Sequence, residues 1–141
     1  MEITRKFEFA TAHRLQDHEG VCANLHGHNY QLEVSVATEV ALDKIGRVVD
    51  FSELKKIVNT FLDANLDHTT IYKEGDPVME QVSLVLESYG LKKPLAFEKN
   101  PTVEVMAQYI LGELQKRMPS NIIVTQIKLY ETSNSFVVVR C

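Results

Sequence analysis

The sequence has few cysteines, no long apolar run and no excess of basic residues. Two cysteines in 141 residues are too few for a disulfide framework, which leaves room for a reduced, functional cysteine. No stretch approaches the roughly 18 apolar residues of a membrane span, and the first residues lack the apolar segment of a signal peptide. The formal net charge of -4 and the absence of a basic cluster argue against nucleic-acid binding. We therefore expect a soluble, cytoplasmic protein with no nucleic-acid or membrane partner.

Internal repeats, low-complexity segments and a glycine-rich phosphate loop are also absent. The chain is 45% apolar and 24% charged, which is ordinary for a globular protein, and its length suits one domain with its own core. We therefore interpret residues 1–141 as a single domain.

Four of the five histidines lie between residues 13 and 30, where Cys22, His26 and His28 occur within seven residues. A strand places residues i and i+2 on one face, so His26 and His28 would aim their imidazoles at one point if this segment is extended. Gly27 between them lets the backbone come close. Two such histidines and a third from nearby form a three-nitrogen set that suits Zn2+, with a fourth position open to water or substrate.

The third ligand is either His13 or His18. We favour His13 because it follows a segment of alternating apolar residues, whereas His18 lies in the polar run 16–20, which resembles a solvated turn. An isolated His-x-His pair is most often two unrelated histidines, but the upstream histidine and cysteine favour a metal site. Cys22 has glycine and asparagine nearby instead of an apolar run, so a buried structural role fits it poorly.

Hydrophobic periodicity predicts an α+β domain. The predicted order is strands at 3–10 and 29–38, helices at 50–65, 76–89 and 102–118, and strands at 122–131 and 136–139. Pairing the first two strands and the last two gives a four-stranded antiparallel sheet with helices packed on one face.

Spacing also predicts which side chains of two elements face the core. In the second helix the apolar stripe consists of Val78, Val82, Val85, Leu86 and Tyr89. In the strand at 122–131 the apolar face consists of Ile123, Ile127 and Leu129.

Three polar residues stand at the ends of predicted elements. Glu131 continues the apolar face of its strand, and because an unpaired buried carboxylate is costly, it either reaches solvent or binds a group that is cationic or rich in N–H donors. Asp67 and His68 follow the first predicted helix. They could form a charge-relay pair, but the residues alone favour a solvated loop with a helix-capping histidine.

Six short motifs, taken in order, resemble one family over nearly the whole chain. They are FATAHRL at 9–15, CANLHGHNY at 22–30, VVDF at 48–51, LDH at 66–68, PTVE at 101–104 and YET at 130–132. The chain resembles the 6-pyruvoyltetrahydropterin synthase and 6-carboxytetrahydropterin synthase family, which has the tunnelling fold. One departure is the segment 71–100, which is longer than the family's usual link and contains the second predicted helix.

The resemblance implies a role for each residue singled out above. It implies that His13, His26 and His28 bind catalytic Zn2+. It makes Cys22 the general base, with Asp67 and His68 as its relay partners, and Glu131 the anchor for the N–H donors of a pterin ring. Thr102 and Glu104 are similar to residues that line the same pocket. The resemblance also implies a homo-oligomer, a trimer or hexamer, with sites between subunits.

The implied substrate is 7,8-dihydroneopterin triphosphate. The Cys-x3-His-Gly-His spacing resembles that of the 6-carboxytetrahydropterin synthases of queuosine biosynthesis, which release acetaldehyde and triphosphate. A spacer longer by two residues is similar to the biopterin-pathway enzymes, which make 6-pyruvoyltetrahydropterin. The alternatives are therefore a biopterin-type synthase or a non-catalytic pterin-binding module.

Overall fold

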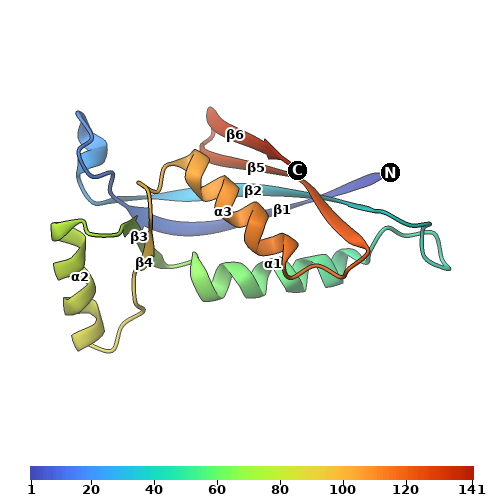
Figure 1. Cartoon of the computed structure of the whole chain (residues 1–141), viewed down its shortest axis with the longest axis horizontal. Coiled ribbons are helices and arrows are strands. Elements are labelled where there is room, and N and C mark those ends of the chain that lie inside the picture. Colours follow the sequence, from blue (N-terminus) through green and yellow to red (C-terminus); the bar gives the residue numbers. More distant parts are fainter.

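The computed structural model describes all 141 residues and contains one six-stranded sheet with three α-helices (Figure 1). The elements are β1 (Glu2–His13), the short 3-10 helix η1 (Val21–Ala23), β2 (His26–Thr38), α1 (Phe51–Asn65), β3 (Thr69–Lys73), α2 (Pro77–Ser88), β4 (Leu95–Phe97), α3 (Val103–Gln115), β5 (Ile122–Thr132) and β6 (Ser135–Arg140). None of the helices is both long and apolar enough to cross a membrane.

The sheet has six strands where four were predicted. Its order is β4-β3-β1-β2-β5-β6, and the four predicted strands β1, β2, β5 and β6 form the expected antiparallel part. The additional strands β3 and β4 are parallel to β1 and extend the sheet beyond it. Both are short, five and three residues, so neither has enough alternation to be recognised before its partner strand is known.

One face of the sheet is covered by α1 and α3, and the other face carries no helix (Figure 1). Alternation along β1 and β2 produces this difference. Phe7, Phe9 and Leu32 are buried under the helices, whereas Lys6 and Glu8, which alternate with Phe7 and Phe9, are exposed on the opposite side. We call the side without helices the open face.

A bulge in β5 changes the predicted inward residues. Ile122 and Val124 are buried before it, and Ile127 and Leu129 after it, because the register with β2 shifts by one residue between Ser35 and Val36. Assigning Ile123 to the core was therefore wrong. Ile127 and Leu129 were assigned correctly.

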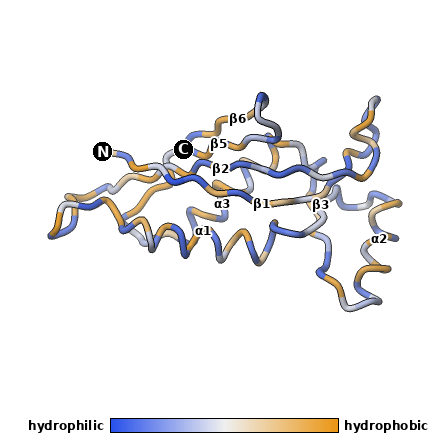
Figure 2. The backbone as a smooth tube through the Cα atoms, turned by 180° about the vertical axis from the view of Figure 1, so that it is seen from behind, coloured by the Kyte–Doolittle hydropathy of each residue, from blue (hydrophilic) through white to orange (hydrophobic).

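The second helix is present, but its predicted stripe is not its buried side. Val82 and Leu86 of this stripe are half-buried, and its other three residues are exposed. Val78, Val85 and Tyr89 are 50%, 56% and 79% exposed, and the buried residues are instead Met79 and Ser83. Helix α2 lies apart from α1 and α3 beside the short strands, and apolar segments are visible along it in Figure 2. Since α2 does not pack on the main core, the period of its apolar residues does not identify its buried side.

We predict that the Leu32→Ala substitution destabilises the fold by about 2–5 kcal/mol, because Leu32 is fully buried between the sheet and the helices. The matched substitution Leu84→Ala, at an α2 position that is 67% exposed, should change stability by less than about 0.5 kcal/mol. Urea unfolding of both variants measures the difference. Equal losses would contradict the assignment of the core.

Candidate metal centre

The pairing of β1 with β2 brings three histidines together. His13 lies opposite His26, and Thr11 lies opposite His28, so all three imidazoles stand on the helix-covered face at one end of the two strands. One ring nitrogen from each histidine lies within 4.8 Å of the others. Sequence periodicity therefore grouped these residues correctly.

Two backbone carbonyls fix the orientation of two of the rings. His13 Nδ1 lies 2.9 Å from the carbonyl oxygen of Pro101, and His26 Nδ1 lies 2.8 Å from that of Asn24. A carbonyl oxygen only accepts, so each Nδ1 carries the hydrogen and each Nε2 presents a lone pair. The two Nε2 atoms lie 3.2 Å apart, and two acceptors cannot share a hydrogen bond.

The nitrogen atoms are spaced as a metal ion requires. Zn–N bonds of 2.0–2.1 Å in a tetrahedral site separate two ligand nitrogens by about 3.3 Å, close to the 3.2 Å found between His13 and His26. His28 Nε2 is buried and has no hydrogen-bond partner. A cation among the three rings would satisfy all of these atoms and leave one tetrahedral position open. The cluster fits a zinc ion on these grounds.

His18, the competing third ligand, does not belong to this cluster. Its Nδ1 accepts a hydrogen bond of 2.8 Å from the Gly20 N–H, so the ring is used by its own exposed loop.

The surroundings of His13 and His28 favour their neutral forms. Burial lowers the pKa of His13 below its ordinary value of 6.5, an effect that the hydrogen bond to Pro101 partly opposes. Burial also lowers the pKa of His28, while the charge of Glu131 acts in the opposite direction. Neutral imidazole is the form that binds a metal.

Glu131 lies beside the cluster. Gln31 pairs with Tyr130 between β2 and β5, and Tyr30 and Glu131 are the next residues along the two strands. The charge of Glu131 acts on the pKa of His28 and on the pKa of Tyr30, which places this carboxylate near both side chains. The Tyr30 hydroxyl is buried without a partner, and burial together with the charge of Glu131 raises the pKa of this phenol. The carboxylate therefore stands within electrostatic reach of both His28 and Tyr30.

Cys22 occupies η1 in the loop between β1 and β2. The thiol is free and half-buried. The backbone carbonyl oxygen of Cys22 accepts a hydrogen bond of 2.9 Å from the Leu15 N–H. Asn24, two residues after Cys22, supplies the carbonyl that is bonded to His26. The backbone of this loop is thus bonded to Leu15, two residues after His13, and to the ring of His26.

Asp67 and His68 form a pair that lies outside the histidine cluster. His68 Nδ1 lies 2.9 Å from Asp67 Oδ2, and Asp67 Oδ1 accepts a hydrogen bond of 2.9 Å from the Ala10 N–H. Burial alone would raise the pKa of Asp67, but the hydrogen bonds from Ala10 and His68 outweigh it and lower that pKa. The His68 side chain is 82% exposed.

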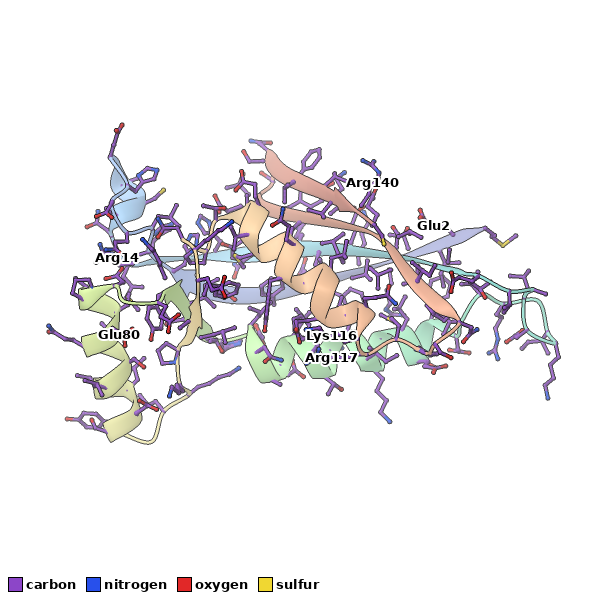
Figure 3. The ribbon with its side chains drawn as sticks, in the orientation of Figure 1. Glu2, Arg14, Glu80, Lys116, Arg117 and Arg140 are labelled. Atoms are coloured by element: carbon purple, nitrogen blue, oxygen red, sulfur yellow. The ribbon has the colours of Figure 1, made fainter.

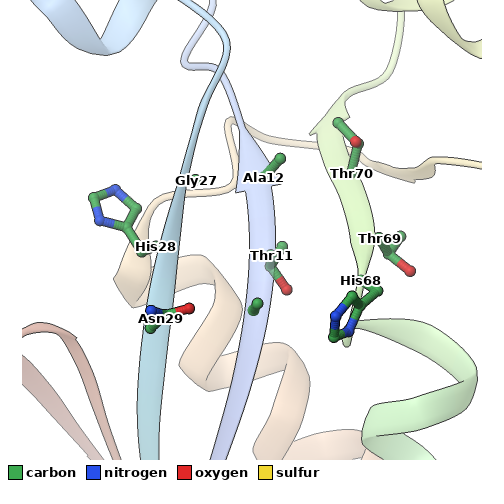
Figure 4. A pocket seen from close by; sticks show the side chains of 9 residues that line it. Thr11, Ala12, Gly27, His28, Asn29, His68, Thr69 and Thr70 are labelled. Atoms are coloured by element: carbon green, nitrogen blue, oxygen red, sulfur yellow. The ribbon is translucent and has the colours of Figure 1, made fainter.

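Asp67 and His68 lie at the open face of the sheet. A depression there is lined by residues that include Ala10, Ala12, Gly27, Asn29, His68 and Thr70. In Figure 4 the side chains of His28 and His68 point in different directions from β2 and from the start of β3. The three imidazoles stand on the helix-covered side, so within one chain the Asp67–His68 pair and the histidine cluster lie on opposite faces of the sheet.

Thr102 and Glu104 stand at the start of α3. Thr102 is the N-cap, and its hydroxyl accepts from the Val105 N–H at 3.4 Å, while Glu104 lies in the first turn. Pro101, just before them, supplies the carbonyl that holds His13. Sequence reasoning missed this carbonyl and that of Asn24, because a backbone acceptor has no residue signature.

A model of the family described as 6-pyruvoyl tetrahydropterin synthase matches residues 2–141. The chain belongs to this family. Two relatives, both 6-carboxy-5,6,7,8-tetrahydropterin synthases, are similar to it over nearly their full length. The Rickettsia typhi protein is 36% identical over 139 residues, 97% of this chain and 98% of that protein. The Haemophilus influenzae protein is 32% identical over 137 residues, 96% of this chain and 95% of that protein.

Solved structures are similar to the chain in fold. An uncharacterized protein from Wolinella succinogenes has a TM-score of 0.80 at 24% identity and covers 99% of this chain and 97% of its own. The 6-pyruvoyl tetrahydropterin synthase of Caenorhabditis elegans has a TM-score of 0.68 at 24% identity and covers 100% and 95%. The α+β tunnelling fold expected for the family is confirmed, with six strands in its sheet.

We predict that zinc binding persists to lower pH than in a site of three ordinary imidazoles. Burial lowers the pKa of His13 and the pKa of His28 below the ordinary imidazole value of 6.5, so protons compete with the metal for these two rings only at lower pH. Competition with a chelator across a range of pH measures the affinity. A decline that begins above pH 7 would contradict the assigned neutral rings.

Two variants serve as controls for the same titration. His28→Ala should lower the affinity by more than about 100-fold, because it removes a ligand and not merely an outer partner. His18→Ala should leave it unchanged.

Proposed function

We propose that the chain is a zinc-dependent 6-carboxy-5,6,7,8-tetrahydropterin synthase of the cytoplasm. It converts 7,8-dihydroneopterin triphosphate and one water molecule into 6-carboxytetrahydropterin, acetaldehyde and triphosphate, a step in queuosine biosynthesis. The observation that carries this proposal is the set of inward-facing imidazoles, with Glu131 near His13 and His28 and the carbonyl of Asn24, in the same loop as Cys22, bonded to His26. The activity named for the relatives in Rickettsia typhi and Haemophilus influenzae, and the three-residue spacer after Cys22, support it.

His13, His26 and His28 hold the metal, which when bound supplies Lewis acidity to the side-chain oxygens of the substrate. Glu131 accepts hydrogen bonds from the N–H donors of the pterin ring and so anchors the substrate beside the histidines. Its position near His28 and Tyr30 suits this role. Thr102 and Glu104, at the start of α3 next to Pro101, line the same pocket.

Cys22 is the general base, which removes a proton from the substrate side chain. A thiolate is the reactive form, and cationic or metal surroundings favour it near neutral pH. Asp67 and His68 are its relay: the carboxylate, 2.9 Å from His68 Nδ1, orients the imidazole that exchanges the proton with the thiol.

The relay pair comes from a second copy of the chain. In one copy it opens onto the open face, whereas the imidazoles stand on the helix-covered face. A complete site therefore requires a homo-oligomer, which we propose is a trimer or a hexamer with sites between subunits.

We predict that the zinc-loaded protein forms 6-carboxytetrahydropterin and acetaldehyde from 7,8-dihydroneopterin triphosphate, with both products identified by mass spectrometry. Cys22→Ala should lower kcat by at least about 100-fold, because it removes the base. Formation of 6-pyruvoyltetrahydropterin would instead assign the chain to the biopterin-type reaction. Pterin binding without turnover would indicate a binding module.

Mixing two inactive variants tests whether sites are shared between copies. Cys22→Ala and His68→Ala each lack one half of the base and relay, so refolding them together should restore part of the activity in mixed oligomers. No recovery in mixtures that do form oligomers would contradict a relay supplied by a second copy.

A further inference from the structure

The segment 71–100 holds a fully buried carboxylate. Asp76 is 0% exposed, and its Oδ2 lies 3.3 Å from Nε of Arg14, whose side chain is 15% exposed. Neither Asp76 Oδ2 nor Arg14 Nε has a hydrogen-bond partner. In Figure 3 Arg14 lies between the loop that carries η1 and the start of α2. A buried charge that loses its partner is strongly destabilising, so the two groups depend on each other.

The two partners belong to different parts of the protein. Asp76 is the N-cap of α2, where its Oδ1 accepts from the N–H groups of Val78 and Met79. Arg14 directly follows the candidate ligand His13 and begins the loop that leads to Cys22. The ion pair therefore fixes the beginning of the Cys22 loop against the start of α2.

A second contact holds the same loop from the other end of the segment. The Asn100 side chain accepts from the Gln16 N–H at 2.9 Å and donates to the Gln16 carbonyl at 2.8 Å. Between these two anchor points, the Leu15 N–H donates to the carbonyl of Cys22 at 2.9 Å. Residues 14–16 are thus held by both ends of the segment and are bonded to the backbone of Cys22.

We propose that Arg14, Asp76 and Asn100 are positioning residues, which fix the Cys22 thiol relative to the three imidazoles. We call these three residues the brace. On this proposal the segment 71–100 supports the site through its ends and not through the exposed apolar side of α2. The effect on turnover rests on the proposed role of Cys22 as base, whereas the effect on the loop does not.

The first measurement is the alkylation rate of Cys22 by iodoacetamide at fixed pH, in the zinc-loaded full chain. Cys141, exposed at the C-terminus, is an internal reference that peptide mass spectrometry resolves separately. Asp76→Asn keeps an oxygen for the helix cap but loses the charge that faces Arg14, and Arg14→Met removes the other partner. Each variant should raise the Cys22 rate about tenfold and leave the Cys141 rate unchanged.

The second measurement separates positioning from binding. A displaced base affects the chemical step, so both variants should lower kcat by about 10- to 100-fold and change KM by less than about threefold. Glu80→Gln, an exposed substitution on the same helix, should change neither the alkylation rate nor kcat. The double variant Arg14→Met/Asp76→Asn should be no worse than the more impaired single variant, because the two residues act as one unit.

Several results would overturn the brace. They are Cys22 alkylation rates within twofold of the unsubstituted chain in both single variants, equal acceleration at Cys22 and Cys141, or single effects that multiply in the double variant. Asn100→Ala breaks the second contact and provides the same test if the ion-pair variants do not fold. If the unsubstituted chain does not turn over the pterin substrate, the proposed function fails, but the alkylation rates still decide whether the brace exists.

Discussion

Two backbone carbonyl oxygens determine which ring nitrogens of His13 and His26 are available to a ligand. By accepting from Nδ1 of His13 and His26, the carbonyls of Pro101 and Asn24 turn both Nε2 lone pairs toward each other at 3.2 Å. Lone pairs at this distance repel unless a cation lies between them. A metal ion bound by both lone pairs would relieve this repulsion. Because Pro101 precedes α3, the packing of that helix against the sheet is a condition for the site.

The sheet divides the functional groups between its two faces. Strict alternation along β1 and β2 places the imidazoles and Tyr30 under the helices, and Asn29 on the open face. Asp67 accepts a hydrogen bond from the Ala10 N–H of β1, and the Asp67–His68 pair lies at the open face of the sheet. A second copy is the source of the relay in our account because side chains cannot pass through a sheet.

The spacing of residues in the sequence predicted those features that depend only on residues near one another in the chain. The alternation of β1 and β2 and the spacing of His26 and His28 identified the metal cluster, since both depend only on residues near in sequence. Strands β3 and β4 were missed because each is short and is defined by its pairing with residues distant in sequence, β3 with β1 and β4 with β3. The buried side of α2 was missed because this helix does not pack on the main core, and the position of Ile123 off the core face was missed because a bulge in β5 shifts the register.

The most direct test of this account is a crystal structure of the zinc-loaded protein, with anomalous diffraction recorded at the zinc absorption edge. We predict one zinc ion per chain, about 2.0–2.1 Å from Nε2 of His13, His26 and His28, with the carbonyls of Pro101 and Asn24 still bonded to Nδ1. Zinc bound through Nδ1, zinc bound at other residues, or no stoichiometric zinc at the three imidazoles would contradict the central claim.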